Sequence, residues 1–287
     1  PIDISFYGYG GNSLNASMIV ARINKKFGIN ITLKEFFSHT TISEQAEIVE
    51  LNDNRTEHTT NLFESVQREY YPLSSAQERM YVLNELEHST NYNATSFIKI
   101  NGKIDYNRVD QAFRKIIERH SVFRSAFVKN NGSIKQFVMD NVDFRIDVVE
   151  VGTGDVDEAI RECIRVFDLS EPPFIRVSLL KISDEEHILV MDLHHIISDG
   201  ISMNIITEEF LKLYRGDECE EVGVQYKDYA VWEKESSEYR DMIAKQEKYW
   251  ESVLGKDLPN IQLPYDYERF NVKNSKGARK YFNISKD

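Results

Sequence analysis

The chain has 287 residues, of which 41% are hydrophobic and 29% are charged, proportions typical of an ordinary globular protein. Asp and Glu total 47 against 35 Lys and Arg, and the resulting net charge of −12 disfavours binding to nucleic acid or to anionic membranes. Because no apolar run is long enough to cross a bilayer, no secretory signal opens the sequence and the two cysteines, Cys163 and Cys219, have no motif spacing, we expect a cytoplasmic protein.

The first fifty residues predict a small all-helical unit. Apolar residues recur at helical spacing over 13–27, and Gly28 follows as the residue that ends this helix. Thr41 and Glu44 have the spacing of a capping box at the start of a second helix. The polar run that follows has little apolar periodicity and predicts a linker. We therefore divide the chain into residues 1–50, a linker over 51–69 and a larger part over 70–287.

The larger part alternates between helical and strand-like periods. Helices are predicted where apolar residues recur every three or four positions, at 76–83, 109–117 and 156–167, and from residues 202 and 226 onward. Strands are predicted at 97–100, 122–128, 134–139, 144–149, 175–182 and 188–193. Because several strands are adjacent in sequence and others are separated by helices, this order predicts an α/β sandwich with a mixed sheet.

The segment Gly10-Gly11-Asn12-Ser13-Leu14 is the first place where chemistry could occur. Its two glycines lead to a serine at the start of an amphipathic helix, where free N–H groups and the helix dipole would stabilise a phosphate ester. The commoner role of such a serine is to cap the helix. No neighbouring histidine activates Ser13, so a functional role would require another enzyme to modify it.

The second place is the segment 188–200, in which an apolar strand ends at His194 and His195. Strand alternation points the two imidazoles to opposite faces. We assign His195 to a cavity, because it lies beside a turn and continues the face of Leu193 and Met191, and we assign His194 to the packed side. A neutral imidazole at this position could take a proton from an amine or a hydroxyl.

Asp199 and Gly200 follow in the turn that leads to the next helix, and Asp199 could orient this turn by pairing with an arginine. Two other roles were weighed for the histidines. Side chains on opposite strand faces are poor joint metal ligands, and no Cys/His cluster completes a site, so we expect no metal. Both histidines could instead be satisfied core groups, but His-His-x3-Asp-Gly at a strand-to-helix turn is more specific than a single histidine and favours a functional role.

Four motifs in order carry a resemblance to a known family. HHIISDG at 194–200 resembles the HHxxxDG signature of condensation domains and chloramphenicol acetyltransferase-like acyltransferases. SSAQERMY at 74–81 resembles SxAQxR, YKDYAVW at 226–232 resembles YxDYAxW, and RHSVFRSAF at 119–127 resembles RHxxLRxxF with Phe123 at the leucine position. The GGNSL segment resembles the carrier-protein motif GGxSL, with Asn12 where Asp or His is usual. The chain is thus similar to a peptidyl carrier followed by a condensation domain of a nonribosomal peptide synthetase.

The resemblance implies the cofactor, the partners and the roles of individual residues. Ser13 would bear 4'-phosphopantetheine, attached by a phosphopantetheinyl transferase, and an upstream adenylation domain would load this carrier. The condensation domain would join a carrier-bound acyl group, expected in the L form, to the amine on a downstream aminoacyl carrier. His195 would be either the general base or a positioner of that amine, with His194 beside it, and the Gly200 N–H would stabilise the oxyanion. Asp199 would pair with Arg124, or alternatively with Arg119.

The resemblance also leaves expectations about completeness and two alternatives. The family pattern implies that the first carrier helix and the second lobe of the condensation domain are missing from this sequence, so we expect weak or no activity from this length of chain alone. An epimerisation domain shares HHxxxDG, although the motif at 74–81 favours condensation. A non-catalytic carrier and docking module would use the lobe as a binding surface only. A freestanding coenzyme A acyltransferase is disfavoured by the fused carrier motif.

Overall fold

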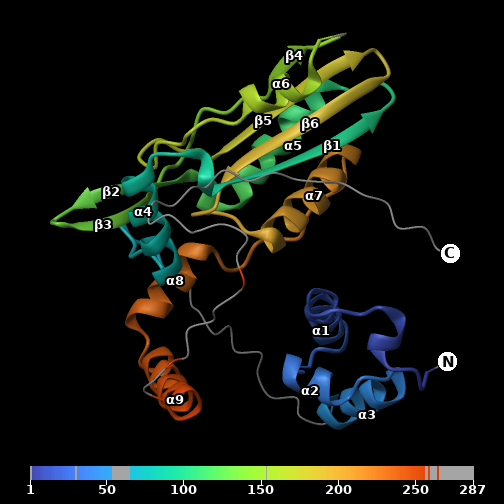
Figure 1. Ribbon diagram of the computed structural model, residues 1–287, viewed down its shortest axis with the longest axis vertical. Helices are drawn as coiled ribbons and strands as arrows, with labels where there is room; N and C mark the ends of the chain where they lie inside the picture. The colour runs from blue at the N-terminus through green and yellow to red at the C-terminus, as the bar shows by residue number, and fades with distance from the viewer. Residues whose placement is uncertain are drawn as a thin grey trace. The chain divides into compact units, whose positions relative to one another are not determined.

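The computed structural model of the protein describes residues 2–29, 31–53, 65–152 and 154–255, together with residues 258 and 264 (Figure 1). Its internal contacts divide the chain into two compact units, residues 1–64 and residues 65–287. No helix within the described ranges combines the length and the apolar character needed to cross a membrane.

The smaller unit is all-helical, as predicted. It contains η1 (Phe6–Tyr9), α1 (Ser13–Phe27), α2 (Leu33–Ser38) and α3 (Ile42–Asp53). The predicted end of α1 at Gly28 is confirmed, because this glycine adopts a left-handed conformation with φ of 66°. The predicted capping box is also confirmed: the Thr41 N–H donates to Glu44 Oε2 at 3.0 Å, and the Glu44 N–H donates to Thr41 Oγ1 at 3.2 Å. The short helix α2 was not predicted.

The predicted linker, residues 51–69, begins inside a helix and ends in a docked segment. Helix α3 continues to Asp53. Residues 54–64 lie outside the described part of the chain. The Val66 N–H donates to Asp228 Oδ1 at 3.0 Å, and the Val66 carbonyl accepts from Lys227 Nζ at 2.6 Å. In the structure the segment from residue 65 therefore belongs to the larger unit.

The larger unit contains a four-stranded mixed sheet and a separate hairpin. Its elements are α4 (Ser75–Glu87), η2 (Thr90–Tyr92), β1 (Asn93–Asn101), α5 (Tyr106–Arg119), η3 (Ser121–Arg124), β2 (Ser125–Asn130), β3 (Ser133–Val138), β4 (Asp147–Glu150), α6 (Val156–Cys163), β5 (Ile175–Ser183), β6 (Glu186–His194), α7 (Gly200–Arg215), α8 (Tyr226–Glu235) and α9 (Ser237–Leu254). The sheet order is β1-β6-β5-β4, in which β4 and β5 are parallel and the other pairs are antiparallel. This arrangement confirms the predicted α/β fold with a mixed sheet.

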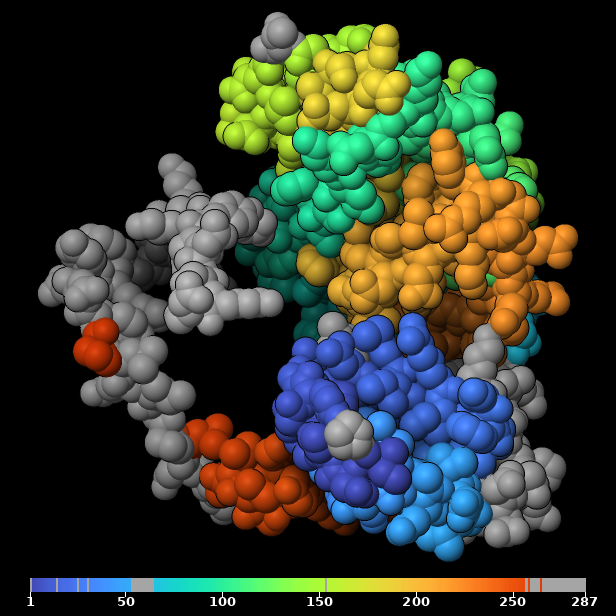
Figure 2. Space-filling model, turned by 90° about the vertical axis from the view of Figure 1, so that its right-hand side faces the viewer, coloured from blue at the N-terminus to red at the C-terminus, as the bar shows by residue number. Residues whose placement is uncertain are grey.

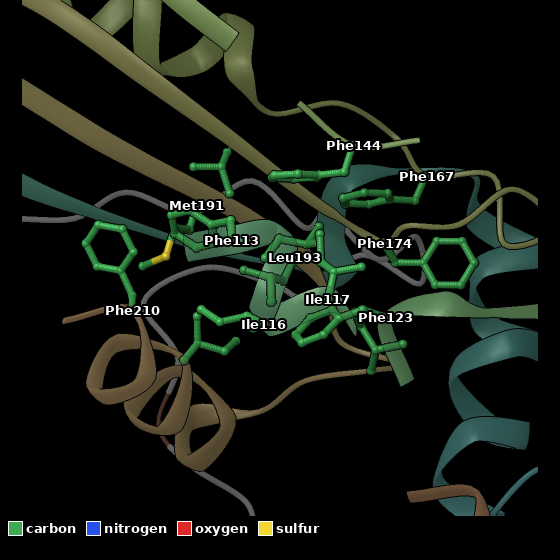
Figure 3. Close-up of a cluster of buried hydrophobic side chains, with 14 of the residues drawn as sticks. Phe113, Ile116, Ile117, Phe123, Phe144, Phe167, Phe174, Met191, Leu193 and Phe210 are labelled. Carbon is green, nitrogen blue, oxygen red and sulfur yellow. The ribbon is translucent and has the colours of Figure 1, made fainter. Parts of the chain in front are cut away.

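Helices cover both faces of the sheet (Figure 1). On one face α5 and α7 pack together over β5 and β6, and on the other face α6 packs against the same two strands. The first layer forms the main core, in which Phe113 of α5 stacks on Phe210 of α7 with ring centroids 4.9 Å apart (Figure 3). Met191 and Leu193 of β6 are 1% and 0% exposed in this core. The end of β6 is therefore held rigidly from below.

Element boundaries differ from the predictions where polar groups override periodicity. The predicted strand 122–128 opens as the 3₁₀ turn η3 and becomes a strand only at residue 125. Strand β4 starts at residue 147, three residues later than predicted. The helix predicted over 156–167 ends at Cys163, because the Arg176 guanidinium binds the carbonyl oxygens of Arg165 at 2.5 Å and of Val166 at 2.9 Å, which removes those carbonyls from any helical ladder. Helix α9 was not predicted.

Candidate functional site

Ser13 is the exposed first residue of α1. The residue that caps this helix is Asn12, whose side-chain oxygen accepts a hydrogen bond from the Asn15 N–H at 3.0 Å. The alternative in which Ser13 is the N-cap is therefore wrong. Because the cap is supplied by its neighbour, the Ser13 hydroxyl lies at the helix N-terminus without a role in holding the helix.

The two glycines before Ser13 have different physical reasons. Gly10 ends η1 in the left-handed region with φ of 76°, a conformation that favours glycine. Gly11 lies against the Phe6 ring, and a side chain there would place its Cβ 2.4 Å from the ring. Phe6 in turn packs edge-on against Phe36 with ring centroids 5.2 Å apart. The turn thus passes closely over a small aromatic cluster and leaves Ser13 facing outward, which fits a serine that carries a bulky covalent group.

His195 opens onto a cavity of about 170 Å³ in the larger unit. The cavity is lined by residues from α4, η3, the turn after β6 and the starts of α7 and α8: Ala76, Gln77, Met80, Val122, His195, Ile196, Ile197, Ser198, Asp199, Ser202 and Tyr226. His195 Nδ1 lies 3.1 Å from the Ser198 carbonyl oxygen. Since a carbonyl can only accept, Nδ1 carries the proton of the neutral ring and Nε2 carries the lone pair. His195 therefore presents a basic nitrogen that is already oriented.

His194 has the opposite environment. Its side chain is 0% exposed, and its ring meets the Phe167 ring edge-on with centroids 6.1 Å apart. The Ile196 N–H donates to His194 Nδ1 at 3.0 Å. Burial, and secondarily the neighbouring His195, lowers the pKa of His194 to about 4, so this imidazole is neutral near pH 7.

The two histidines do point apart, but the reason given from the sequence was wrong. Leu193 and Met191, whose face His195 was expected to continue, are buried in the main core. Strand β6 ends at His194, and the His195 N–H then donates to the Tyr92 carbonyl at 2.8 Å. The turn that begins there carries the His195 side chain away from the core and into the cavity.

Asp199 caps α7 and does not pair with an arginine. Its Oδ1 accepts from both the Ser202 N–H and the Ser202 hydroxyl at 2.8 Å. These hydrogen bonds, led by the one from the Ser202 backbone, hold the pKa of Asp199 below its ordinary value although partial burial opposes them. The Asp199 carboxylate thereby fixes the start of α7 and, with it, the turn that carries His195.

The predicted pairing of Asp199 with Arg124, or with Arg119, is wrong. The Arg124 guanidinium donates to the carbonyl oxygens of Ile117 and Met139 at 3.2 and 2.5 Å, and also to those of Glu118 and Asp140. It therefore satisfies the orphan carbonyls at the end of α5. Arg119 instead pairs with Glu209 of α7 at 3.2 Å. His120 binds the same carboxylate at 2.8 Å, so residues 119 and 120 brace α5 against α7.

Gly200 is the first residue of α7, a helix that lies at the surface of the larger unit (orange in Figure 2). The N–H groups of a first helical turn have no intrahelical partner. A Cβ added at Gly200 would meet no atom within 4 Å, so the space beside this backbone is open. The structure places Gly200 next to Asp199 but not among the described residues that line the cavity.

Two further cavity residues belong to recognised motifs but were not assigned a role from the sequence. Tyr226 begins α8, and its hydroxyl lies 2.9 Å from Ser74 Oγ. Burial raises the pKa of Tyr226. Gln77 is the third residue of α4 and is 1% exposed. Their spacing of about 150 residues gives no sequence signal that they share a cavity. Within the described ranges no group of three or more His, Cys, Asp or Glu side chains could hold a metal ion.

Two family models match the chain. Residues 67–287 match the model described as "Condensation domain", and residues 1–49 match the model described as "Phosphopantetheine attachment site". The covalent cofactor of the smaller unit is therefore 4'-phosphopantetheine. Surfactin synthase subunit 2 of Bacillus subtilis (strain 168) is 37% identical over 277 residues, which are 96% of this chain and 8% of that protein. The chain thus spans a small part of the length of its curated relative.

Solved structures share the fold of the larger unit. The condensation domain from the Monacolin K polyketide synthase superposes with a TM-score of 0.59 at 28% identity, covering 68% of this chain and 44% of that chain. The X-domain from teicoplanin biosynthesis superposes with a TM-score of 0.63 at 24% identity, covering 72% of this chain and 48% of that chain. The similarity to the second structure shows the fold alone.

Proposed function

We propose that this chain, which belongs to the condensation-domain family and carries a phosphopantetheine attachment segment ahead of that domain, forms amide bonds as part of a nonribosomal peptide synthetase. The observation that carries the proposal is the orientation of His195, whose Nε2 lone pair is presented by the hydrogen bond from Nδ1 to the Ser198 carbonyl. The reaction is an acyl transfer from a thioester to an amine. The substrates are a carrier-bound acyl chain and the amine of a downstream aminoacyl carrier.

His195 handles the proton that amide formation releases. As the amine nitrogen forms a bond to the acyl carbon and the bond from that carbon to sulfur breaks, the amine must lose one proton. His195 Nε2 accepts a hydrogen bond from the amine, then takes this proton and passes it to the departing sulfur. His194 stays neutral behind it, because burial keeps the pKa of His194 at about 4.

Asp199 and Gly200 serve the same step through the start of α7. Asp199 is a positioning residue, because its bonds to Ser202 fix the first turn of the helix beside the cavity. We assign to the Gly200 N–H the stabilisation of negative charge on the acyl oxygen. The N-terminal position of Gly200 in α7 and the open space beside it support this role. Arg124 contributes by holding the end of α5 and not by contacting the substrate.

In the smaller unit we assign the attachment point to Ser13. Its exposure, its place at the N-terminus of a 15-residue helix and the cap supplied by Asn12 support this assignment. When bound, 4'-phosphopantetheine supplies a thiol that carries an acyl group as a thioester. A phosphopantetheinyl transferase would attach the group, and an upstream adenylation domain would load it.

The test is single-turnover amide formation in the full protein that carries this sequence, comparing His195→Gln with the unchanged protein. Loss of the base should slow amide formation by roughly 10²–10⁴-fold, while acylation of the carrier stays unchanged. An unchanged rate would support a docking module without catalysis. Exchange of the substrate α-proton without amide formation would identify an epimerisation domain.

A further inference from the structure

The side chain of Gln77 is held by one end only. Its Oε1 accepts from the Ser74 N–H at 3.0 Å and from Gln136 Nε2 at 3.3 Å. In the described part of the chain, Gln77 Nε2 is buried and has no hydrogen-bond acceptor. A buried donor without an acceptor costs roughly 1–3 kcal/mol. The fold therefore keeps an amide nitrogen whose cost is not offset within the protein.

The helix cap does not require this nitrogen. Gln77 is the third helical residue in the capping box of Ser74, and a capping box needs only an acceptor there. The same box in the smaller unit uses a glutamate twice, in Thr32 with Glu35 and in Thr41 with Glu44. Burial of Gln77, which is 1% exposed, explains a neutral amide in place of a carboxylate. It does not explain the unpaired donor.

The surroundings of Gln77 indicate what the missing acceptor is. Gln77 lines the same cavity as His195, and most of the neighbouring walls are apolar, among them Met80, Val122 and Ile197. The Tyr226 hydroxyl in this cavity is already bonded to Ser74 Oγ. Because two donors hold Gln77 Oε1, the direction of the amide nitrogen is fixed before any ligand arrives. A preorganised neutral donor in a largely apolar cavity suits a carbonyl oxygen.

We propose that Gln77 Nε2 donates a hydrogen bond to a carbonyl oxygen of the acyl substrate that reacts beside His195. This inference rests on the proposed function and adds a substrate-positioning residue to it. The carbonyl belongs either to the thioester or to the amide one residue back along the acyl chain, and both present the same acceptor.

The experiment uses the full protein that carries this sequence and the variant Gln77→Glu. A glutamate keeps the acceptor for the Ser74 and Gln136 donors and removes both amide N–H groups. We expect kcat/KM for the acyl donor to fall about tenfold or more. The pH dependence that reports His195 should not move, because Gln77 does not contact that ring. Gln77→Met, which carries no charge, should show the same loss.

The matched control is Asn84→Asp, another buried amide on α4 that is 3% exposed and does not line the cavity. Folding is followed by tryptophan fluorescence, since both tryptophans, Trp232 and Trp250, belong to the larger unit. We expect Asn84→Asp to change stability without changing kcat/KM of the folded protein. An equal fall in kcat/KM for Asn84→Asp, or a fall confined to Gln77→Glu, would overturn the proposal, because packing or charge would then explain it.

Two acyl donors distinguish the carbonyls. With a peptidyl thioester and a simple acyl thioester that lacks the preceding amide, equal losses assign the thioester carbonyl, and a loss confined to the peptidyl donor assigns the amide carbonyl. Unchanged rates with both donors refute the proposal. A wild-type comparison needs no variant to fold: a thioether analogue without the thioester carbonyl and one without the amide carbonyl should each be compared for binding, and equal affinity of both with the parent ligand refutes it. If His195→Gln also has no effect, the proposed function itself fails.

Discussion

The two candidate sites of this protein are built over very different lengths of chain. The surroundings of Ser13 come from one short segment, with Gly10 and Gly11 in the turn and Asn12 as the cap. The cavity at His195 is assembled from segments that start at Ala76 and end at Tyr226. A modified serine needs only one exposed hydroxyl, whereas a reaction between two substrates needs a shielded volume. Damage should therefore stay local at the first site and arrive from remote residues at the second.

The largest expected effect is at Ser13. The variant Ser13→Ala should lose completely the mass increase that the protein gains with coenzyme A and a phosphopantetheinyl transferase. Its helix should remain, because Asn12 provides the cap. Intact-protein mass spectrometry measures this, with Ser17→Ala, one turn along α1, as the control that should still gain the full mass. Any residual increase in Ser13→Ala would break the comparison, because the site would then extend beyond one residue.

A remote residue should have the largest effect on the stability of the larger unit. Asp228 is 1% exposed, binds Lys227 at 2.9 Å and accepts the N–H groups of Val66 and Gln225. Asp228→Asn leaves the Lys227 ammonium buried without a counter-charge, which should lower the free energy of unfolding by about 3–5 kcal/mol. Denaturant unfolding followed by tryptophan fluorescence measures this loss. The exposed ion pair partner Arg68 is the control, and Arg68→Ala should cost less than about 1 kcal/mol.

The buried imidazole should make the larger unit sensitive to acid. Because the pKa of His194 is about 4 in the folded protein and near 6.5 when unfolded, the unfolded chain binds a proton first as the pH falls. The His194 contribution to stability is therefore fully present above pH 6.5 and is lost progressively down to pH 4, by about 3 kcal/mol in total. Unfolding curves between these pH values should show a shallower dependence in His194→Phe. Identical slopes would place His194 outside the core.

The smallest expected effect is at Asp199. Loss of its cap in Asp199→Ala should lower the free energy of unfolding by about 1 kcal/mol. Since Arg124 binds carbonyl oxygens and not this carboxylate, its removal should add independently. In a double-mutant cycle of Asp199→Ala with Arg124→Ala, we expect a coupling energy within about 0.5 kcal/mol of zero. A coupling above 1 kcal/mol would restore the ion pair that the sequence suggested.

The sequence was most informative where the physics is local. The helix over 13–27, its end at Gly28 and the capping box at Thr41 depend on neighbours within four residues, and all three were predicted. The mixed sheet also followed, because strand periodicity at 175–182 and 188–193 survives in β5 and β6. Helix α2 was missed because its six residues carry too short an apolar pattern, although Thr32 and Glu35 had the capping-box spacing.

The parts that could not be predicted depend on long-range contacts. Both arginines considered for Asp199 had the right charge, but only the fold shows that Arg124 meets carbonyl oxygens and that Arg119 meets Glu209. Asp199 and Ser202 do have the spacing of a cap, and this local signal was available. Gln77 was within a recognised motif, yet its unpaired nitrogen becomes visible only when the whole cavity is assembled.

Gly200 offers a molecular ruler at this cavity. Its φ lies outside the left-handed region, and an added methyl group would touch nothing within 4 Å in the described chain. An alanine there therefore leaves the protein's own packing unchanged while it occupies volume that an incoming reactant would cross. Any slowing of amide formation in a folded Gly200→Ala variant measures how closely the reacting molecule approaches the backbone. A graded series of larger side chains would then calibrate that approach in ångströms.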